Sequence, residues 1–119
     1  MKENVIKRKS FEFAVRIVKL YKLLRDERNE FVLSKQLLRS GTSIGANIRE
    51  SLNAQSIADF IHKNSIAQKE CDETLYWIEL LKETEYITEK EFVSIEEDAK
   101  ELLKIIRSII LSSKTKLHS

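Results

Sequence analysis

The chain has no proline and only two glycines, Gly41 and Gly45, among its 119 residues. A sheet protein of this size would need many tight turns, and turns draw heavily on those two residue types. A β-sandwich or β-barrel is therefore strongly disfavoured. Hydrophobic residues make up 42% and charged residues 34% of the chain, which is typical of a folded protein rather than a disordered one. We expect one all-α domain over residues 1–119.

The sequence also has little that would suggest export or a membrane. The single cysteine, Cys71, cannot form a disulfide within the chain, so nothing points to an oxidising compartment. No apolar run approaches the roughly 20 residues that a membrane-spanning helix needs. The charged start, residues 1–9, is not followed by the apolar segment of a signal peptide. We therefore expect a cytoplasmic protein with no membrane association.

Side chains that could carry out catalysis are sparse. His62 and His118 have no second metal ligand at helical spacing, and the Glu-x-x-His motif of di-iron bundles is absent. Cys71 has no histidine nearby, which favours a core residue over a nucleophile. The adjacent acids at 96–98 would fan around a helix rather than converge, so they indicate a solvated face. The sequence predicts no catalytic residue, no metal site and no cofactor, and hence a protein that is not an enzyme.

Hydrophobic periodicity predicts four helices, over about residues 10–25, 34–53, 56–85 and 88–111. Ser10 and Ser34 are the expected N-caps of the first two, with Asn29 an alternative start for the second. Ser56-x-x-Asp59 resembles a capping box, and Thr88-x-x-Glu91 is a complete one. The polar residues after Leu111 are expected to fray. Because short connections make successive helices antiparallel, we predict an up-down-up-down four-helix bundle.

The first predicted helix is apolar over more of its surface than one bundle requires. Its two apolar stripes are Phe13, Ile17, Leu20 and Leu24, and Phe11, Ala14, Val18 and Tyr21. Together they cover about 180° of a helical wheel, whereas a helix packed on one layer needs a little over 100°. The excess predicts contacts with something beyond the bundle.

Charge is unevenly distributed along the chain. Residues 1–50 contain 12 Lys/Arg and 6 Asp/Glu, whereas residues 51–119 contain 9 and 13. Within residues 70–101 the imbalance is 3 basic against 12 acidic side chains. The overall net charge of +2 is a weak signal for nucleic-acid binding. The two halves could instead pair within one folded unit or between copies.

The second predicted helix carries an unusual pattern of small residues. Gly41 and Gly45 fall on its apolar stripe, where they would let another backbone approach closely. Ser40, Ser43 and Asn47 fall on a small-polar stripe, which suggests buried or interfacial hydrogen bonds. The alternative is an ordinary mixture of capping and solvent-facing residues.

Residues 33–50, LSKQLLRSGTSIGANIRE, closely resemble the signature of the bacterial four-helix bundle proteins, also known as 23S rRNA intervening-sequence or S23 ribosomal proteins. The family pattern is Gln-Leu-x-Arg-Ser/Ala, then Ser-Ile, then Asn-Ile-x-Glu-Gly. The signature residues, for which we expect structural or interface roles, are Gln36, Ser40, Gly41, Ser43, Ile44, Gly45, Asn47, Ile48 and Glu50. Leu37 and Arg39 also match, whereas Ser51 stands where the family has glycine. The resemblance extends over nearly the whole chain.

The resemblance implies a ring-shaped homopentamer with no known catalytic activity. A related branch, the accessory protein of diversity-generating retroelements, associates with a reverse transcriptase and binds nucleic acid. We therefore expect a non-enzymatic oligomeric scaffold that associates with RNA or DNA through basic surface residues. The candidates are Lys7, Arg8, Lys9, Arg16, Lys19, Lys22, Lys35, Arg39 and Arg49. The alternatives are a protein-interaction adaptor that uses its acidic face to bind a partner such as a reverse transcriptase, and charges that merely solvate the bundle.

Overall fold

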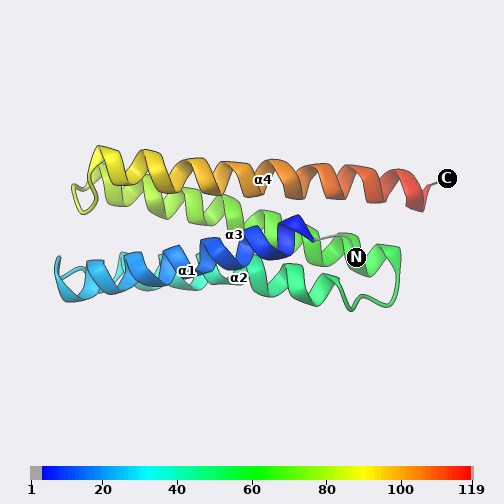
Figure 1. The fold of residues 1–119 in the computed structure, drawn as a ribbon, viewed down its shortest axis with the longest axis horizontal. Helices are drawn as coiled ribbons and strands as arrows, with labels where there is room; N and C mark the ends of the chain where they lie inside the picture. Colours follow the sequence, from blue (N-terminus) through cyan, green and yellow to red (C-terminus); the bar gives the residue numbers. More distant parts are fainter. Residues whose placement is uncertain (1–3, 119) are drawn as a thin grey trace.

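The computed structural model describes residues 4–118, which form four helices: α1 (Val5–Asp26), α2 (Leu33–Ser51), α3 (Ile57–Glu83) and α4 (Glu89–Leu117). Successive helices run antiparallel through short loops (Figure 1). No residue between 4 and 118 lies in a β-strand. The predicted all-α class with four antiparallel helices is confirmed.

The sequence signals for the starts of α3 and α4 are confirmed. The Ser56 hydroxyl accepts a hydrogen bond of 3.0 Å from the Asp59 backbone N–H and caps α3. At α4, Thr88 and Glu91 form the reciprocal capping box, in which each side chain accepts from the other residue's backbone N–H. Two orphan donors at this helix end are thereby satisfied.

The predicted start of the first helix is wrong by about one and a half turns. The helix begins at Val5, because the Asn4 side chain accepts from the Lys7 backbone N–H at 3.0 Å. Ile6 is buried and extends the apolar stripe by a further turn. Ser10, the expected cap, instead lies buried inside the helix and donates to the Lys7 carbonyl oxygen.

The start of α2 also differs from the prediction. Ser34 is not its N-cap, because the buried carboxylate of Glu30 accepts hydrogen bonds from the backbone N–H groups of Val32, Leu33 and Ser34 at 2.6–3.1 Å. Asn29, the alternative start, has a left-handed backbone with φ of 55° and lies in the loop. The Glu30 carboxylate, which lies outside the helix, thus accepts the hydrogen bonds that an N-cap side chain would accept.

Three helix ends differ as well. The third helix ends at Glu83, two residues before the predicted end. The second helix ends at Ser51, two residues before the predicted end, and the Ser51 hydroxyl donates to the Ile48 carbonyl oxygen. The fourth helix continues to Leu117, where fraying from residue 112 was expected. Its last turns lie beside the start of α3, because Ser113 and Lys116 line one groove together with Ile57 and Phe60.

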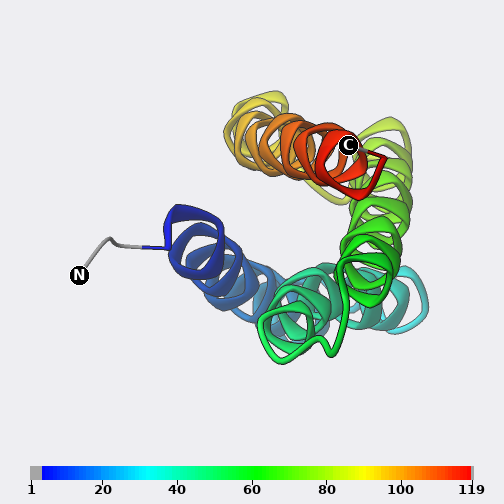
Figure 2. The same cartoon turned by 90° about the vertical axis from the view of Figure 1, so that its right-hand side faces the viewer.

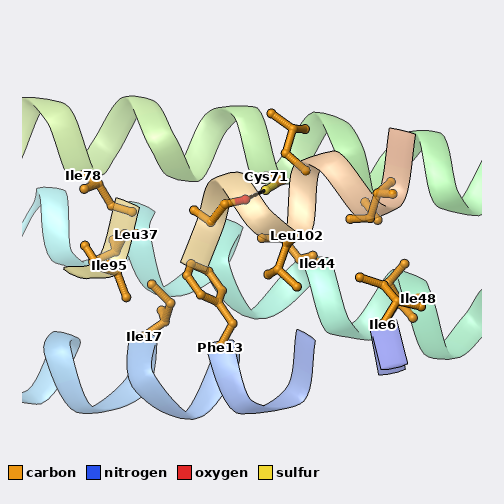
Figure 3. Packing of buried hydrophobic residues seen from close by; sticks show 14 of the residues in the cluster. Ile6, Phe13, Ile17, Leu37, Ile44, Ile48, Cys71, Ile78, Ile95 and Leu102 are labelled. Atoms are coloured by element: carbon orange, nitrogen blue, oxygen red, sulfur yellow. Dashed lines mark hydrogen bonds between the residues drawn. The ribbon is translucent and has the colours of Figure 1, made fainter. Parts of the chain in front are cut away.

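The core is a single cluster of side chains from all four helices (Figure 3). Cys71 belongs to it and is fully buried, with its thiol donating to the Ala99 carbonyl oxygen at 3.2 Å. Burial raises the pKa of the Cys71 thiol to about 12. The prediction that Cys71 is a core residue is confirmed.

The two glycines allow α1 to approach α2 closely. A Cβ atom at Gly41 would lie 2.8 Å from two side-chain carbons of Ile17. A Cβ atom at Gly45 would lie 3.3 Å from the Ser10 carbonyl oxygen. The predicted close approach is therefore made within the chain, and it explains why helix-weakening glycine is used twice on one stripe.

Viewed along its long axis, the molecule has the outline of an open letter C with α1 and α4 at the two tips (Figure 2). The sequential pairs α1–α2, α2–α3 and α3–α4 pack side by side. Ion pairs join the tips, Lys9 with Glu101 and Arg16 with Asp98. We call this α1–α4 boundary the seam. The seam pairs basic side chains of the first half with acidic side chains of the second half within one chain.

Candidate nucleic-acid interface

All nine predicted nucleic-acid-binding cations lie on the first two helices. Lys7, Arg8, Lys9, Arg16, Lys19 and Lys22 lie on α1, and Lys35, Arg39 and Arg49 lie on α2. Their surroundings divide them into two groups, which differ in how closely a carboxylate of the same chain holds the charge.

Three of the cations are held by carboxylates of the same chain. Lys9 lies 2.7 Å from the Glu101 carboxylate across the seam. Arg16 pairs with Asp98, and its second terminal nitrogen donates to the Ser94 hydroxyl at 2.9 Å. Arg8 lies 2.6 Å from Glu12 one turn along the same helix. These side chains would have to exchange a carboxylate for a phosphate before they could bind nucleic acid.

The second group projects from the outer faces of α1 and α2. Four of its lysines, Lys7, Lys19, Lys22 and Lys35, are exposed and make no ion pair among residues 4–118. Arg39 is 64% exposed and lies 3.6 Å from Glu73, at the long end of an ion pair. We call these five side chains together with Arg49 the outer basic face. Its charges remain available to an anionic partner.

Apolar side chains lie among these cations. Phe11 is 53% exposed, and the Arg49 guanidinium stacks over its ring at 5.2 Å. A groove of about 270 Å³ runs beside Phe11 and is lined on the second helix by Thr42 and Ala46. Ala14, Val18 and Tyr21 of the same predicted stripe are only half-buried. The chain's own bundle therefore covers the second apolar stripe of α1 only in part.

The signature residues lie on two sides of α2. Toward the interior, Gly41, Ile44 and Ile48 are buried. The buried Ser40 hydroxyl lies 2.9 Å from that of Thr74, which joins α2 to α3.

The remaining signature side chains are more exposed. Ser43 and Asn47 are half-buried and donate to backbone carbonyl oxygens one turn earlier in α2. Glu50 lies 3.9 Å from Lys63, and Gln36 is exposed. The hydrogen bonds that the signature makes are local or lead to α3.

A charged cluster that the sequence did not predict lies where the two end loops meet. The Arg28 guanidinium makes two hydrogen bonds of 2.8 Å with the Glu91 carboxylate and a third with the Tyr86 carbonyl oxygen. The bond from Arg28 is the main reason that the pKa of Glu91 falls to about 2. Glu91 was recognised only as a capping residue, because sequence spacing reveals its contact within α4 and not its contact across the bundle.

The same loop region includes Glu30. Burial acts to raise the pKa of this carboxyl, but the N–H donors of Leu33, Ser34 and Val32 outweigh burial, so the pKa is lowered overall. The polar loop that contains Glu30 gave no sequence signal of burial.

Other candidate chemistry is not assembled in the described part of the chain. His62 and His118 are both exposed. Between residues 4 and 118, no three His, Cys, Asp or Glu side chains are grouped so that they could hold a metal ion. Over the same residues, no helix combines the length and apolar character needed to cross a bilayer.

Comparison with known proteins supplies the family. The sequence profile of the 23S rRNA-intervening sequence protein family matches residues 2–108. A crystal structure of a protein of unknown function from the S23 ribosomal protein family of Bacteroides thetaiotaomicron VPI-5482 is 64% identical, covers 92% of this chain and 98% of its own, and superposes with a TM-score of 0.90. Curated proteins give no significant match. The chain therefore belongs to the 23S rRNA-intervening sequence protein family, as its signature indicated.

Proposed function

We propose that this protein is a non-enzymatic homo-oligomeric scaffold that binds nucleic acid, RNA in particular, through its outer basic face. The observation that carries the proposal is the exposure of Lys7, Lys19, Lys22 and Lys35 without ion pairs among residues 4–118. The exposed aromatic ring among them, Phe11, lies under the Arg49 guanidinium, so we expect binding to phosphates that is independent of sequence. Repetition of a weak site around an oligomer raises its avidity.

The oligomer we propose is the homopentamer that the family resemblance implies. Its support in this chain is the second apolar stripe of α1, on which Phe11 is exposed and the other members are only half-buried. Isolated apolar side chains are common on protein surfaces, but a stripe beside a groove is typical of an interface. The basic first half and the acidic second half suit head-to-tail contacts that close a ring.

Light scattering coupled to size exclusion tests the assembly. A concentration-independent monomer near 13.9 kDa would contradict it. Phe11→Glu is expected to lower the mass of the assembly while circular dichroism stays unchanged, because Phe11 is exposed in the subunit. Leu111→Glu is the matched control, since Leu111 is a 69% exposed side chain on α4, away from the stripe.

The nucleic-acid contact is tested by fluorescence anisotropy with a short RNA and a short DNA duplex at two salt concentrations. A plot of the logarithm of the binding constant for single strands against the logarithm of the salt concentration should have a negative slope. We expect a slope of about −0.7 for each phosphate bound. No binding at about 50 mM salt and micromolar protein would exclude this function. Binding that is unaffected by salt would contradict the phosphate mechanism.

A double variant locates the binding face. Gly41 lies opposite Ile17, so in antiparallel helices Lys35 lies near the level of Lys22. Lys22→Gln/Lys35→Gln is expected to weaken RNA binding and to reduce its salt dependence. Lys104→Gln/Lys114→Gln removes the same charge from exposed positions of α4 and should have a much smaller effect.

The second candidate function is a protein-interaction adaptor, with a basic partner such as a reverse transcriptase. It is favoured by Tyr76, which is 58% exposed on α3 in the acidic segment 70–101. A scaffold that keeps its assembly but binds no RNA would favour this function. Binding of a lysine-rich peptide that is weakened by Asp72→Asn/Glu79→Gln would support it directly, because both carboxylates are exposed on α3.

A further inference from the structure

The seam between α1 and α4 contains two grooves with different linings. One, of about 360 Å³, is lined mainly by side chains of both signs, among them Lys9, Arg16, Asp98 and Glu101, which are paired with one another. The other, of about 390 Å³, lies closer to the loops and has Leu20, Leu23 and Ile95 in its lining. We call the second one the apolar trough.

Ion pairs flank the apolar trough, an open groove, at both ends. At one end Arg16 reaches across to Asp98 and Ser94, and at the other Arg28 holds Glu91. The trough follows α1 from Arg16 to Leu23, which is about 10 Å at the helical rise of 1.5 Å per residue. A helix or an extended peptide would have to cross these ends, whereas a short ligand fits between them.

Two lysines line the trough on opposite helices. Lys19 comes from α1 and Lys90 from the first turn of α4, and neither makes an ion pair among residues 4–118. The carboxylate in the lining, Glu91, is neutralised by the two hydrogen bonds from Arg28. The trough therefore combines an apolar floor with uncompensated positive charge.

We propose that the apolar trough binds a small alkyl carboxylate with a chain of about eight carbons. The alkyl chain lies on Leu20, Leu23 and Ile95, and the carboxylate lies between Lys19 and Lys90. A small number of charged groups beside an apolar floor is the usual composition of a ligand site. The other groove lacks this character, because its charges satisfy one another.

Titration of the full-length protein with sodium octanoate, followed by two-dimensional amide NMR, tests the proposal. Chemical shift changes should be confined to residues 16–23 and 90–95, with an affinity in about the millimolar range for a ligand of this size. Octan-1-ol, which carries the same chain without the charge, should bind more weakly. Shifts distributed over the whole core, or equal binding of the two ligands, would overturn the proposal.

Lys90→Gln is the decisive variant, since Lys90 is exposed, lies outside the outer basic face and should not affect folding. It is expected to weaken octanoate binding about two- to fivefold, the range of a solvent-exposed ion pair, and to leave octan-1-ol binding unchanged. Lys104→Gln, on the exposed side of the same helix, is the matched control. A Lys90→Gln variant that binds octanoate as the wild type does would contradict the site.

Discussion

The interface between α2 and α3 and the seam between α1 and α4 join helices by different means. At the first, Leu37, Ile44, Ile78 and Leu81 are fully excluded from solvent. Its internal polar contact, between Ser40 and Thr74, is equally buried. At the seam, the connecting side chains are charged and between 28% and 52% exposed.

The two kinds of contact therefore have different roles, one in the stability of the fold and the other in how α1 and α4 are aligned. Burial of apolar surface contributes about 25 cal/mol for each Å² removed from water, whereas an exposed ion pair contributes about 0–1 kcal/mol. The fold is therefore held mainly by the apolar interfaces, while the ion pairs determine which turns of α1 and α4 face each other. Substitutions in the two regions should therefore change the free energy of unfolding by different amounts, and these changes should respond differently to salt and pH.

The largest effect is expected from filling the close approach at Gly41. Gly41→Leu should reduce the free energy of unfolding by about 3 kcal/mol, because even a Cβ would lie 2.8 Å from Ile17 and the core cannot expand freely. Ala46→Leu, on the exposed side of the same helix, should change it by less than about 0.5 kcal/mol. Urea unfolding followed by circular dichroism measures both, and equal effects would contradict close packing at Gly41.

Changes to the buried Ser40–Thr74 hydroxyl pair are expected to reduce the free energy of unfolding by less, and the two single changes should not be additive. Thr74→Val should cost about 1–2 kcal/mol, because it leaves the Ser40 hydroxyl without its partner on α3. The double variant Ser40→Ala/Thr74→Val should cost less than the sum of the single changes, since it removes both polar groups together. Additive costs in chemical unfolding would show that the two hydroxyls do not interact.

The Arg28–Glu91 pair should make the free energy of unfolding depend on pH in the acidic range. The pKa of Glu91 is lowered from 4.5 to about 2, so its stabilising contribution is complete above pH 4.5 and is lost as the pH falls toward 2. Glu91→Gln should therefore be about 1 kcal/mol less stable than the wild type at pH 7, allowing for partial exposure, and indistinguishable from it near pH 2. Thermal unfolding across this range measures the difference. If Glu91→Gln stayed less stable at pH 2, the effect would not come from the charge.

Periodicity and capping predicted those parts of the fold that depend on contacts within a helix. The starts of α3 and α4 are correct because Ser56 and Thr88 bond to N–H groups three residues ahead, a spacing visible in the sequence. The apolar stripes and the close approach at Gly41 were predicted for the same reason.

Contacts between distant segments were not predictable in this way. The Glu30 carboxylate replaces the expected cap at Ser34 because the loop folds back over the helix start. The fourth helix extends past residue 111, where Ser113 and Lys116 line a groove together with the start of α3. For the outer basic face, composition identified the cations, but only tertiary structure separates those held by α4, such as Lys9 and Arg16, from those facing solvent.

The smallest effect on global stability is expected at the seam itself. Arg16→Gln removes the pair with Asp98 and the hydrogen bond to Ser94, and should reduce the free energy of unfolding by about 0.5 kcal/mol at low salt. At about 1 M salt the difference from wild type should shrink, because salt weakens the interaction of solvent-exposed charges. Lys100→Gln is the matched control, since its partner Glu96 lies one turn away within α4.

Amide hydrogen exchange distinguishes the two variants more sharply than unfolding does. Arg16→Gln should raise exchange in the half of α1 that faces the seam, because local opening needs less free energy than global unfolding. Exchange in α2 and α3 should stay at the wild-type rate, since the contacts of Ile44 and Ile78 are untouched. Lys100→Gln should leave α1 unchanged, because its ion pair does not cross the seam. Uniformly faster exchange through all four helices in Arg16→Gln would show that the seam ion pairs contribute to the whole bundle, and the contrast with the α2–α3 interface would then be wrong.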